Sequence, residues 1–536
     1  MPWRRKLKVS HGARNAHRHS RRTSRALGPR KCPAMLGQRC VWGRSLSTIA
    51  GMPLRHEAAP LLASALAFIA RDQAPFYSPG HKGGRSLDPA LRASLAELDL
   101  NNLPDTDTLH CPTGAIREAE TLLSDAYGVD HSYMLVGGST SGNIAAILST
   151  VRPGQSFLVQ RNAHKSVIAG IIHAGAVPIW LMPEHDADFG IALGVSAPSV
   201  DAAFRTHPEA QALFALNPTY FGTTPDIAAL AAVCRAHGKL LLVDEAHGPH
   251  FHFCPALFPR AAEDVGADAV VQSSHKILSA LSQAAVLHTC GPRIDPAIVR
   301  KVLQLIQTTS PNFAIMASID TARRQMMLEG KDLLQAAIAR ARHAREALSA
   351  MPGIAVLGRS QLRGPGSGFH DLDETKIVLR VDELGLTGYE LQRLLNSDYG
   401  IQPELGGEEH VLFILTLANT DADVARLLQA MSAIARAPRV ARRARDRLQL
   451  AFNDGLPVQA TTPREAFYAR AEDCAFEAAA GRICAEVVTP YPPGIPVLMP
   501  GERISRDLLA GLLAVKEARC PISASDPALA TLRVLA

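Results

Sequence analysis

Short apolar runs, separated by longer segments with helical periodicity, fill the middle of the chain. The apolar runs predict strands at 132–136, 156–160, 177–181, 212–216, 240–243, 269–271 and 284–288. The segments between them predict helices, for example at 144–151 and 227–237. Continuous apolar strands that alternate with helices are typical of a parallel sheet buried between two helical layers. The pattern therefore predicts an α/β fold, with a mostly parallel sheet that carries helices on both faces.

The flanking segments follow other patterns, which predict further parts of the chain. Further helices are expected at 58–71, 116–127, 297–307, 314–329, 331–350, 387–396, 440–450 and 469–479, and further strands near 376–381 and 411–416. We predict a basic extension (1–51), an N-terminal arm with a large domain (52–310), a helical connection with a small α+β domain (311–450) and a C-terminal α+β domain (451–536).

Charge is distributed unevenly along the chain. Residues 1–50 carry thirteen Lys and Arg and no Asp or Glu, whereas the remainder carries 43 basic and 50 acidic residues. The formal charge of +6 therefore comes from the extension, and the remainder gives no support for nucleic-acid binding. The extension fits a transit peptide or translated upstream sequence with the true start at Met52. We favour the second, because ordered patterning begins abruptly at Pro53, and we expect the extension to be disordered.

Composition narrows the class of protein. Hydrophobic residues make up 47% and charged residues 20%, as in ordinary soluble globular proteins. No apolar run reaches eighteen residues, so a membrane span is not expected. The nine cysteines form no C-x-x-C pair, which favours a reduced cytoplasmic protein over a disulfide framework or a metal site.

An acid and a lysine follow two of the predicted strands. Asp244 ends the strand at 240–243, and Lys276 follows the strand at 269–271. Each residue alone is also typical of a solvated loop, but the carboxyl ends of neighbouring parallel strands meet at one sheet edge. A pyridoxal-phosphate enzyme needs a lysine that condenses with the cofactor aldehyde and an acid that keeps the pyridine nitrogen protonated. The pair therefore predicts a pyridoxal 5'-phosphate site.

Hydroxyl groups near this sheet edge are candidates for holding the cofactor phosphate. Ser139, Thr140 and Ser141 stand just before the helix expected at 144–151, and Ser273 precedes the lysine. Hydroxyls and free amides at a helix start bind phosphate well, although serine at this place is also a common helix cap.

Histidines surround the same edge. His164 follows the strand at 156–160 and is expected to stack on the pyridine ring, although a lone histidine is more often structural. Ala246 is small and would let the pyridine ring approach the strand, and His247 is the next residue. His275, beside Lys276, is placed to shuttle a proton. His81 and Lys82 lie in a Gly- and Pro-rich loop that is either a substrate-binding loop or a plain connector.

The chain resembles the fold-type-I, pyridoxal-phosphate-dependent ornithine/lysine/arginine decarboxylases. The likeness runs in the family's order from about residue 75 to 505. It rests on P-G-H-K-G-G (79–84), G-S-T-S-G-N (138–143), R-N-A-H-K-S (161–166), N-P-T-Y-F-G (217–222), D-E-A-H-G (244–248), Q-S-S-H-K (272–276), Q-T-T-S-P (307–311) and Y-P-P-G-I-P-V-L-M-P-G-E (491–502).

The resemblance implies roles for individual residues. Lys276 would be the Schiff-base lysine, Asp244 the pyridinium partner and His164 the stacking residue. Ser139, Thr140 and Ser273 would lie at the phosphate, which Thr308 or Thr309 would reach across a dimer interface. The chain resembles the short branch without an N-terminal wing domain. Glu404, Glu408 or Glu409 would recognise a distal amine or guanidinium, although such acids are also typical of a solvated loop.

The expected function is decarboxylation of lysine, ornithine or arginine by a homodimer or larger homo-oligomer in the cytoplasm. The sequence does not choose among the three substrates. Another reaction on the same cofactor, by an aminotransferase or an aldolase-like lyase, is the nearest alternative. A non-catalytic binding protein is a further alternative, which only the basic extension supports.

Overall fold

The computed structural model describes residues 56, 58–103, 105–437, 456–490, 495–517 and 521–536. The chain forms two compact units, Met1–Ala70 and Arg71–Ala536. The first contains helix α1 (Pro60–Ile69), which lies within the helix predicted at 58–71. The extension 1–51 lies outside the described residues. The second unit is not divided at residues 310 or 450, so the predicted domain boundaries stay a prediction.

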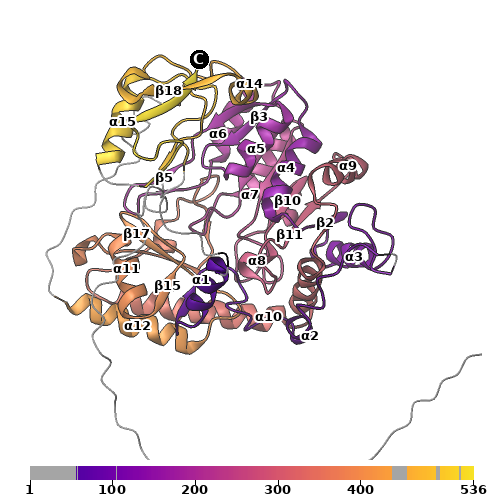
Figure 1. Ribbon diagram of the computed structural model, residues 1–536, viewed down its shortest axis with the longest axis vertical. Coiled ribbons are helices and arrows are strands. Elements are labelled where there is room, and N and C mark those ends of the chain that lie inside the picture. Colours follow the sequence, from indigo (N-terminus) through magenta and orange to yellow (C-terminus); the bar gives the residue numbers. More distant parts are fainter. Residues whose placement is uncertain (1–55, 57, 104, 438–455, 491–494, 518–520) are drawn as a thin grey trace, which may run out of the picture. The chain divides into compact units, whose positions relative to one another are not determined.

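A mostly parallel sheet lies at the centre of the second unit (Figure 1). Its described strands are, in spatial order, β2 (His131–Leu135), β11 (Ala285–Thr289), β10 (Ala269–Gln272), β9 (Leu240–Asp244), β7 (Ala212–Leu216), β3 (Ser156–Gln160) and β4 (Val177–Leu181). Only β11 among them runs antiparallel to its neighbours. The predicted strands and fold class are confirmed.

Helices cover both faces of this sheet because successive residues of a strand point to opposite faces. On one face Val159 and its equivalents pack against α4 (Gly138–Thr150), α5 (Lys165–Ala174) and α9 (Pro296–Ile306). On the other face Leu158 and its equivalents pack against α6 (Ala197–Thr206) and α7 (Ile227–Ala236). At the β2–β11 edge, α3 (Ala115–Tyr127) packs against the long helix described in the next paragraph. Together they form a third hydrophobic core.

That long helix, α10 (Phe313–Ser349), corrects the prediction of two helices separated at Gly330. A glycine weakens a helix by only about 1 kcal/mol, and buried Met326 and Leu334 on either side pack into one core. Packing therefore outweighs the local propensity to break.

A smaller antiparallel sheet follows, with the order β12 (Ala355–Val356), β14 (Lys376–Arg380), β17 (His410–Ile414) and β16 (Leu405–Gly406). Helices α11 (Gly388–Asp398) and α12 (Asp421–Arg436) pack on it. Strand β1 (Ala74–Phe76) pairs in parallel with β15 (Ile401–Pro403), which ties the start of this unit to the small sheet. The strands expected at 376–381 and 411–416 are confirmed, whereas α12 was not predicted.

The C-terminal region differs from its prediction. Instead of a helix at 469–479 it has α14 (Pro463–Tyr468), strand β18 (Ala471–Ala475) and a 3-10 turn (Phe476–Ala478). β18 pairs with β21 (Thr531–Leu535), and α15 (Arg506–Glu517) packs nearby. The alanines of this segment favour a helix when they are read locally. The strand forms because its partner lies near the chain end, which a local pattern does not show. The helix predicted at 440–450 lies outside the described residues.

Short elements complete the second unit. They are α2 (Pro89–Ala93), β5 (His185–Asp186), β6 (Ile191–Ala192), β8 (Thr223–Thr224), α8 (Ser274–Ile277), β13 (Asp371–Leu372), β19 (Thr489–Pro490) and β20 (Ile522–Ser523). Among the described helices, none combines the length and apolar character needed to cross a membrane.

Candidate active site

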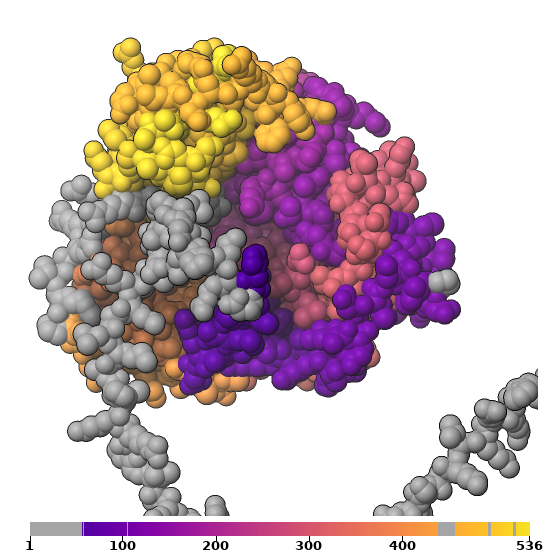
Figure 2. All heavy atoms as spheres, viewed as in Figure 1, coloured from indigo at the N-terminus to yellow at the C-terminus, as the bar shows by residue number. Residues whose placement is uncertain are grey.

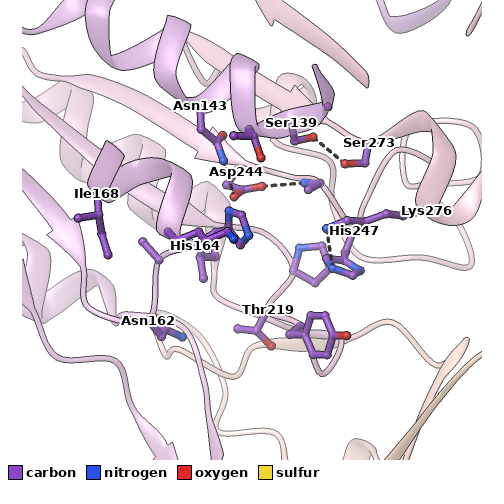
Figure 3. A pocket seen from close by; sticks show the side chains of 18 of the residues that line it. Ser139, Asn143, Asn162, His164, Ile168, Thr219, Asp244, His247, Ser273 and Lys276 are labelled. Atoms are coloured by element: carbon purple, nitrogen blue, oxygen red, sulfur yellow. Dashed lines mark hydrogen bonds between the residues drawn. The ribbon is translucent and has the colours of Figure 1, made fainter. Parts of the chain in front are cut away.

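A cavity of about 710 Å³ lies at the carboxyl ends of the central strands (Figure 3). The ends of β3, β7, β9 and β10 and the amino ends of α4 and α5 supply most of its lining. The rest of the lining comes from the small sheet, from the C-terminal region, from the short strand β6 and from the loop before β11. These residues are Leu405, Val487, Thr489, Pro496, Ala192, Ser282 and Gln283. Open α/β sheets commonly bind ligands at this edge.

Asp244 lies at the end of β9, and its carboxylate is held by two donors. Asn143 Nδ2 donates to one carboxylate oxygen at 2.8 Å, and the Ala246 amide donates to the other at 3.0 Å. The residue is buried, and it pairs in register with Val271 of β10. These contacts fix the direction of a carboxylate at the sheet edge, as predicted from its place after an apolar run.

Lys276 lies in α8, immediately after β10. Its Nζ atom is 2.9 Å from His247 Nε2. Burial lowers the pKa of Lys276, although the carboxylates of Asp244 and Glu404 act against this shift. Burial, assisted by the charge of Lys276, also holds the pKa of His247 well below its usual range. The pair therefore favours a neutral imidazole beside an amine that loses its proton readily, which is the state in which an amine is nucleophilic.

His164 caps the amino end of α5 and is joined to Asp244 through two intermediate residues. Asn143 Nδ2 also donates to Ser166 Oγ at 2.9 Å. Ser166 in turn contacts His164 Nδ1 through its hydroxyl at 2.8 Å and its amide at 3.2 Å. Because Ser166 Oγ accepts from Asn143, its own proton is free for His164 Nδ1. Nδ1 therefore acts as an acceptor, so the proton of the neutral His164 imidazole lies on Nε2. Burial lowers the pKa of the ring.

The candidate phosphate site differs from its prediction. The helix expected at 144–151 begins earlier, because α4 starts at Gly138, whose φ of 70° favours glycine. The three hydroxyl residues therefore lie in its first turn and not before it. Ser139 and Thr140 line the cavity, and Ser139 Oγ shares a hydrogen bond of 2.6 Å with Ser273 Oγ. Ser141 does not line this cavity, and its hydroxyl donates to the Gly138 carbonyl at 2.8 Å. The first amide of α4, that of Gly138, donates to the Gln283 carbonyl at 2.9 Å. The amides of Ser139 and Thr140 have no carbonyl four residues earlier in the helix, so they add donors to this end of the cavity.

His275 and Ala246 also line the cavity. His275 Nδ1 lies 2.9 Å from the carbonyl of Ala284, to which it donates, so Nε2 remains for proton exchange. Burial lowers the pKa of His275. The structure thus brings together Asp244, Lys276, His164, His247 and His275.

The predicted substrate loop lies outside the cavity lining. Lys82 is buried, and its Nζ donates to the carbonyls of Tyr77 and Ile414. His81 Nδ1 accepts from the Gly84 amide at 2.8 Å. Gly80 lies against the backbone carbonyls of Ile277 and Leu278, too close for any side chain. The loop therefore supports the backbone around Lys276 and does not line the cavity itself.

The candidate acids differ from one another. Glu404 accepts from the hydroxyl of Tyr220, a cavity-lining residue, at 2.6 Å, and from the Ser78 amide at 2.8 Å. Glu408 and Glu409 do not line the cavity. Thr308 and Thr309 are exposed and lie outside the lining, where their carbonyls accept from His110 and Asn102.

Sequence reasoning missed Asn143, Tyr220 and the C-terminal wall of the cavity. Asn143 lies one helical turn after Ser139 in the G-S-T-S-G-N motif, so helical spacing would have placed it on the same side. The motif at 491–502 contains Pro496, but its sequence does not show that it lies at the cavity, because that position depends on contacts more than 300 residues apart along the chain.

The donor set fits a polar aromatic ligand that carries a phosphate. Within the described residues, Asn143 Oδ1 and His247 Nδ1 are buried without a hydrogen-bond partner, and both residues line the cavity. A buried polar atom without a partner is costly, so a polar group in the cavity would relieve this cost. Serine hydroxyls and helix amides suit a phosphate, the Asp244 carboxylate suits a protonated ring nitrogen, and the Lys276 amine suits an aldehyde. Pyridoxal phosphate carries all three groups.

Comparison with known proteins gives the family. A model described as the major domain of Orn/Lys/Arg decarboxylase matches residues 59–423, and one for its C-terminal domain matches residues 445–520. An arginine decarboxylase of Halalkalibacterium halodurans is 35% identical over 486 residues, which are 90% of this chain and 98% of that protein. The constitutive lysine decarboxylase of Escherichia coli K12 is 24% identical, over 84% of this chain and 76% of that protein.

Solved structures show the same fold. The Escherichia coli constitutive lysine decarboxylase superposes with a TM-score of 0.70 at 23% identity, over 89% of this chain and 81% of that chain. A structure of SPT with PLP has a TM-score of 0.52 at 18% identity, over 68% and 88%. The central sheet and its helices are thus those of fold-type-I enzymes. Because the major-domain model matches more than half of the chain, the chain belongs to the Orn/Lys/Arg decarboxylase family.

Proposed function

We propose that this enzyme decarboxylates a basic amino acid with pyridoxal phosphate, giving the amine and CO2. The observation that supports this proposal most strongly is that the Asp244 carboxylate and the Lys276 amine lie at the ends of two adjacent parallel strands, inside one cavity. Arginine is the first substrate to test, because the relative that matches over 98% of its length is named arginine decarboxylase. Lysine and ornithine follow from the family description.

The cavity offers a place for each part of the cofactor. The amides at the start of α4, with Ser139, Thr140 and Ser273, would hold the phosphate. Asp244 would hold a proton on the pyridine nitrogen, and His164 and Ala246 would contact the ring. When bound and attached to the substrate, pyridoxal phosphate supplies an electron sink for the pair left behind by the departing carboxyl group.

The chain's own residues orient the reactants and move protons. The lowered pKa of Lys276 supplies a free amine for attachment of the cofactor. Asn143 keeps the Asp244 carboxylate directed while also ordering Ser166 and thereby His164. His275 Nε2 or Lys276 Nζ is the group that would return a proton to the substrate carbon. Held donors of this kind need no reorganisation during the reaction.

A homodimer in the cytoplasm is part of the same proposal. Thr308 and Thr309 are exposed and do not line the cavity of their own chain, which supports a role at the cavity of a second copy. Light scattering with and without Thr309→Ala, together with cofactor titration, tests this role. We expect weaker cofactor binding in the variant.

The experiment that tests the function is CO2 release from arginine, lysine, ornithine and several neutral amino acids, with wild type and Lys276→Ala. We expect release from a basic substrate by the wild type and loss of release in the variant. If the wild type binds cofactor but releases nothing from any of these substrates, the proposal is wrong. Transamination and aldol cleavage are then the reactions to measure.

A further inference from the structure

A C-terminal segment forms one wall of the cavity although it supplies none of the candidate catalytic side chains. Val487, Thr489 and Pro496 line the cavity. Their stretches of chain are joined by backbone hydrogen bonds, from the Val488 amide to Leu498 at 3.0 Å and from the Val497 amide to Val488 at 2.8 Å. We call residues 487–489 and 496–498 the C-terminal wall. In Figure 2 the yellow and light orange atoms of the C-terminal region lie directly against the purple atoms of the sheet region.

One fully buried side chain joins this wall to the sheet. Arg161 is the first residue after β3, and its Nε and Nη2 atoms donate to the carbonyls of Pro496 and Val497, each at 3.0 Å. The same guanidinium donates through Nη1 and Nη2 to both carboxylate oxygens of Glu502. It also lies over the ring of Trp180, 5.2 Å from the ring centroid. Four of the five N–H groups of the guanidinium thus donate to acceptors in the C-terminal region.

Glu502 is fully buried too and ties the same segment together. Besides Arg161, it accepts from the Met499 amide at 2.8 Å. Met499 packs on Ile168 and Ile172 of α5. A buried ion pair adds little net stability over an apolar pair of the same shape, but it tolerates only one geometry. The pair is therefore better explained as a device that fixes the position of the wall than as one that stabilises the fold.

The loop that follows Arg161 is held independently of the wall. The amide of Ala163 donates to Gln160, and Asn162 Nδ2 donates to Leu193. His164 is fixed through Ser166 and Asn143, as described above. Loss of the Arg161–Glu502 pair should therefore loosen the wall while leaving His164 and the cofactor-facing residues in place.

We propose that Arg161 and Glu502 are positioning residues that hold the C-terminal wall against the cavity and thereby set the space available to the substrate side chain. The part of this inference that concerns substrate rests on the proposed function. The part that concerns the wall does not, because it is measurable without turnover.

The test uses Glu502→Gln, which keeps the shape of the side chain and removes its charge. The matched control is Glu120→Gln. Glu120 is also buried, pairs with both Nη atoms of Arg300 at 2.5 and 3.2 Å, and accepts from the Met134 amide, but neither partner lines the cavity. Both variants lose a buried ion pair, so a general loss of stability affects both.

The first measurement is hydrogen exchange of the holoenzyme. In the wild type, the amides of Val488 and Val497 should exchange as slowly as those of β9. In Glu502→Gln they should exchange at least tenfold faster, and in Glu120→Gln they should not change. The second measurement is kinetic. For a basic substrate, Glu502→Gln should raise KM about tenfold, with kcat and the Kd for pyridoxal phosphate within about threefold of wild type.

The inference is overturned if the wall amides of Glu502→Gln exchange as in Glu120→Gln, or if its KM matches that control. If Glu502→Gln does not fold, Arg161→Lys takes its place, because it keeps a cation opposite Glu502 but loses the fork that reaches Pro496 and Val497. Fast exchange of the wall amides in the wild type would overturn the inference without any variant. If no basic amino acid is decarboxylated by the wild type, the proposed function fails, and the exchange result still decides whether the pair holds the wall.

Discussion

Lys276 and Lys82 both lose most of their contact with bulk water, and burial lowers the pKa of each. Their surroundings differ. Lys82 has two fixed carbonyl acceptors, Tyr77 and Ile414, and it does not line the cavity. Within the described part of the chain, His247 is the one hydrogen-bond partner of Lys276 Nζ, and burial lowers the pKa of that histidine. Lys276 faces the cavity of about 710 Å³.

The comparison teaches that burial alone does not identify a reactive lysine. For Lys82, the carboxylates of Glu404 and Asp423 act against burial, and its pKa is about 7. An amine that donates to two backbone carbonyls holds the chain around it, whereas an amine beside a neutral imidazole and an open cavity is available for chemistry. Lys82 is thus a structural clamp beneath the site, and Lys276 is the candidate nucleophile.

Replacement of Lys276 by alanine should have the largest effect. We expect Lys276→Ala to lower the decarboxylation rate by about 10⁴-fold or more, because the amine proposed to bind the cofactor covalently is lost. CO2 release at saturating substrate measures this effect. Lys82→Met is the control, and it should keep the rate within about tenfold of wild type. Equal losses in both variants would contradict the division of roles.

Replacement of Lys82 should act mainly on stability. Lys82→Met leaves the Tyr77 and Ile414 carbonyls without this donor, so the free energy of unfolding should fall by about 1–3 kcal/mol at pH 7. Urea unfolding of the apo-protein measures the change. If stability is unchanged and activity is lost, Lys82 binds substrate, which is one of the two roles that the sequence left open for its loop.

Much of the central fold was predictable because its information is local. The strands at 156–160 and 212–216 have the predicted bounds, since each is a largely buried apolar run. The edge strand at 177–181 also has the predicted bounds, although only two of its five residues are buried. The C-terminal region was not predictable in this way. Its strand β18 depends on pairing with β21, which starts more than fifty residues later, while its own alanines favour a helix.

In the candidate site, too, some residues could be predicted from the local sequence and others could not. Asp244 and Lys276 were predictable because each directly follows a strand, and parallel strands bring their ends together. Asn143 was not predicted, because its bond to Asp244 joins residues 101 positions apart. His81 and Lys82 were assigned to substrate because the glycines and proline of their loop show that the chain turns but not what it turns toward.

The pH dependence of stability sharpens the contrast between the two lysines. Lys82 has a pKa of about 7 when folded and 10.5 ordinarily, so between these values the unfolded chain binds a proton that the folded protein does not. Stability should therefore rise with pH from about 7 to 10, by at most about 1.4 kcal/mol per pH unit for this residue. Lys376, also with a pKa of about 7, adds a similar contribution. Lys82→Met should reduce the slope of the unfolding free energy against pH, and an unchanged slope would contradict the assignment.

The smallest expected effect comes from the carboxylate that both lysines share. Glu404 raises the pKa of Lys82 more than any other group does, whereas for Lys276 the contribution of Asp244 comes first. Glu404→Gln should therefore lower the pKa of both lysines, and at Lys82 it removes the largest of the charges that raise the pKa. Lysine Cε NMR shifts of the apo-protein, followed against pH and assigned with Lys82→Met and Lys276→Ala, measure both in one sample. Glu408→Gln is the control, because Glu408 is not among the groups that shift either pKa. A larger change at Lys276 would mean that Glu404 acts mainly on the candidate nucleophile. The contrast between a structural Lys82 and a reactive Lys276 would then not follow from their neighbouring charges.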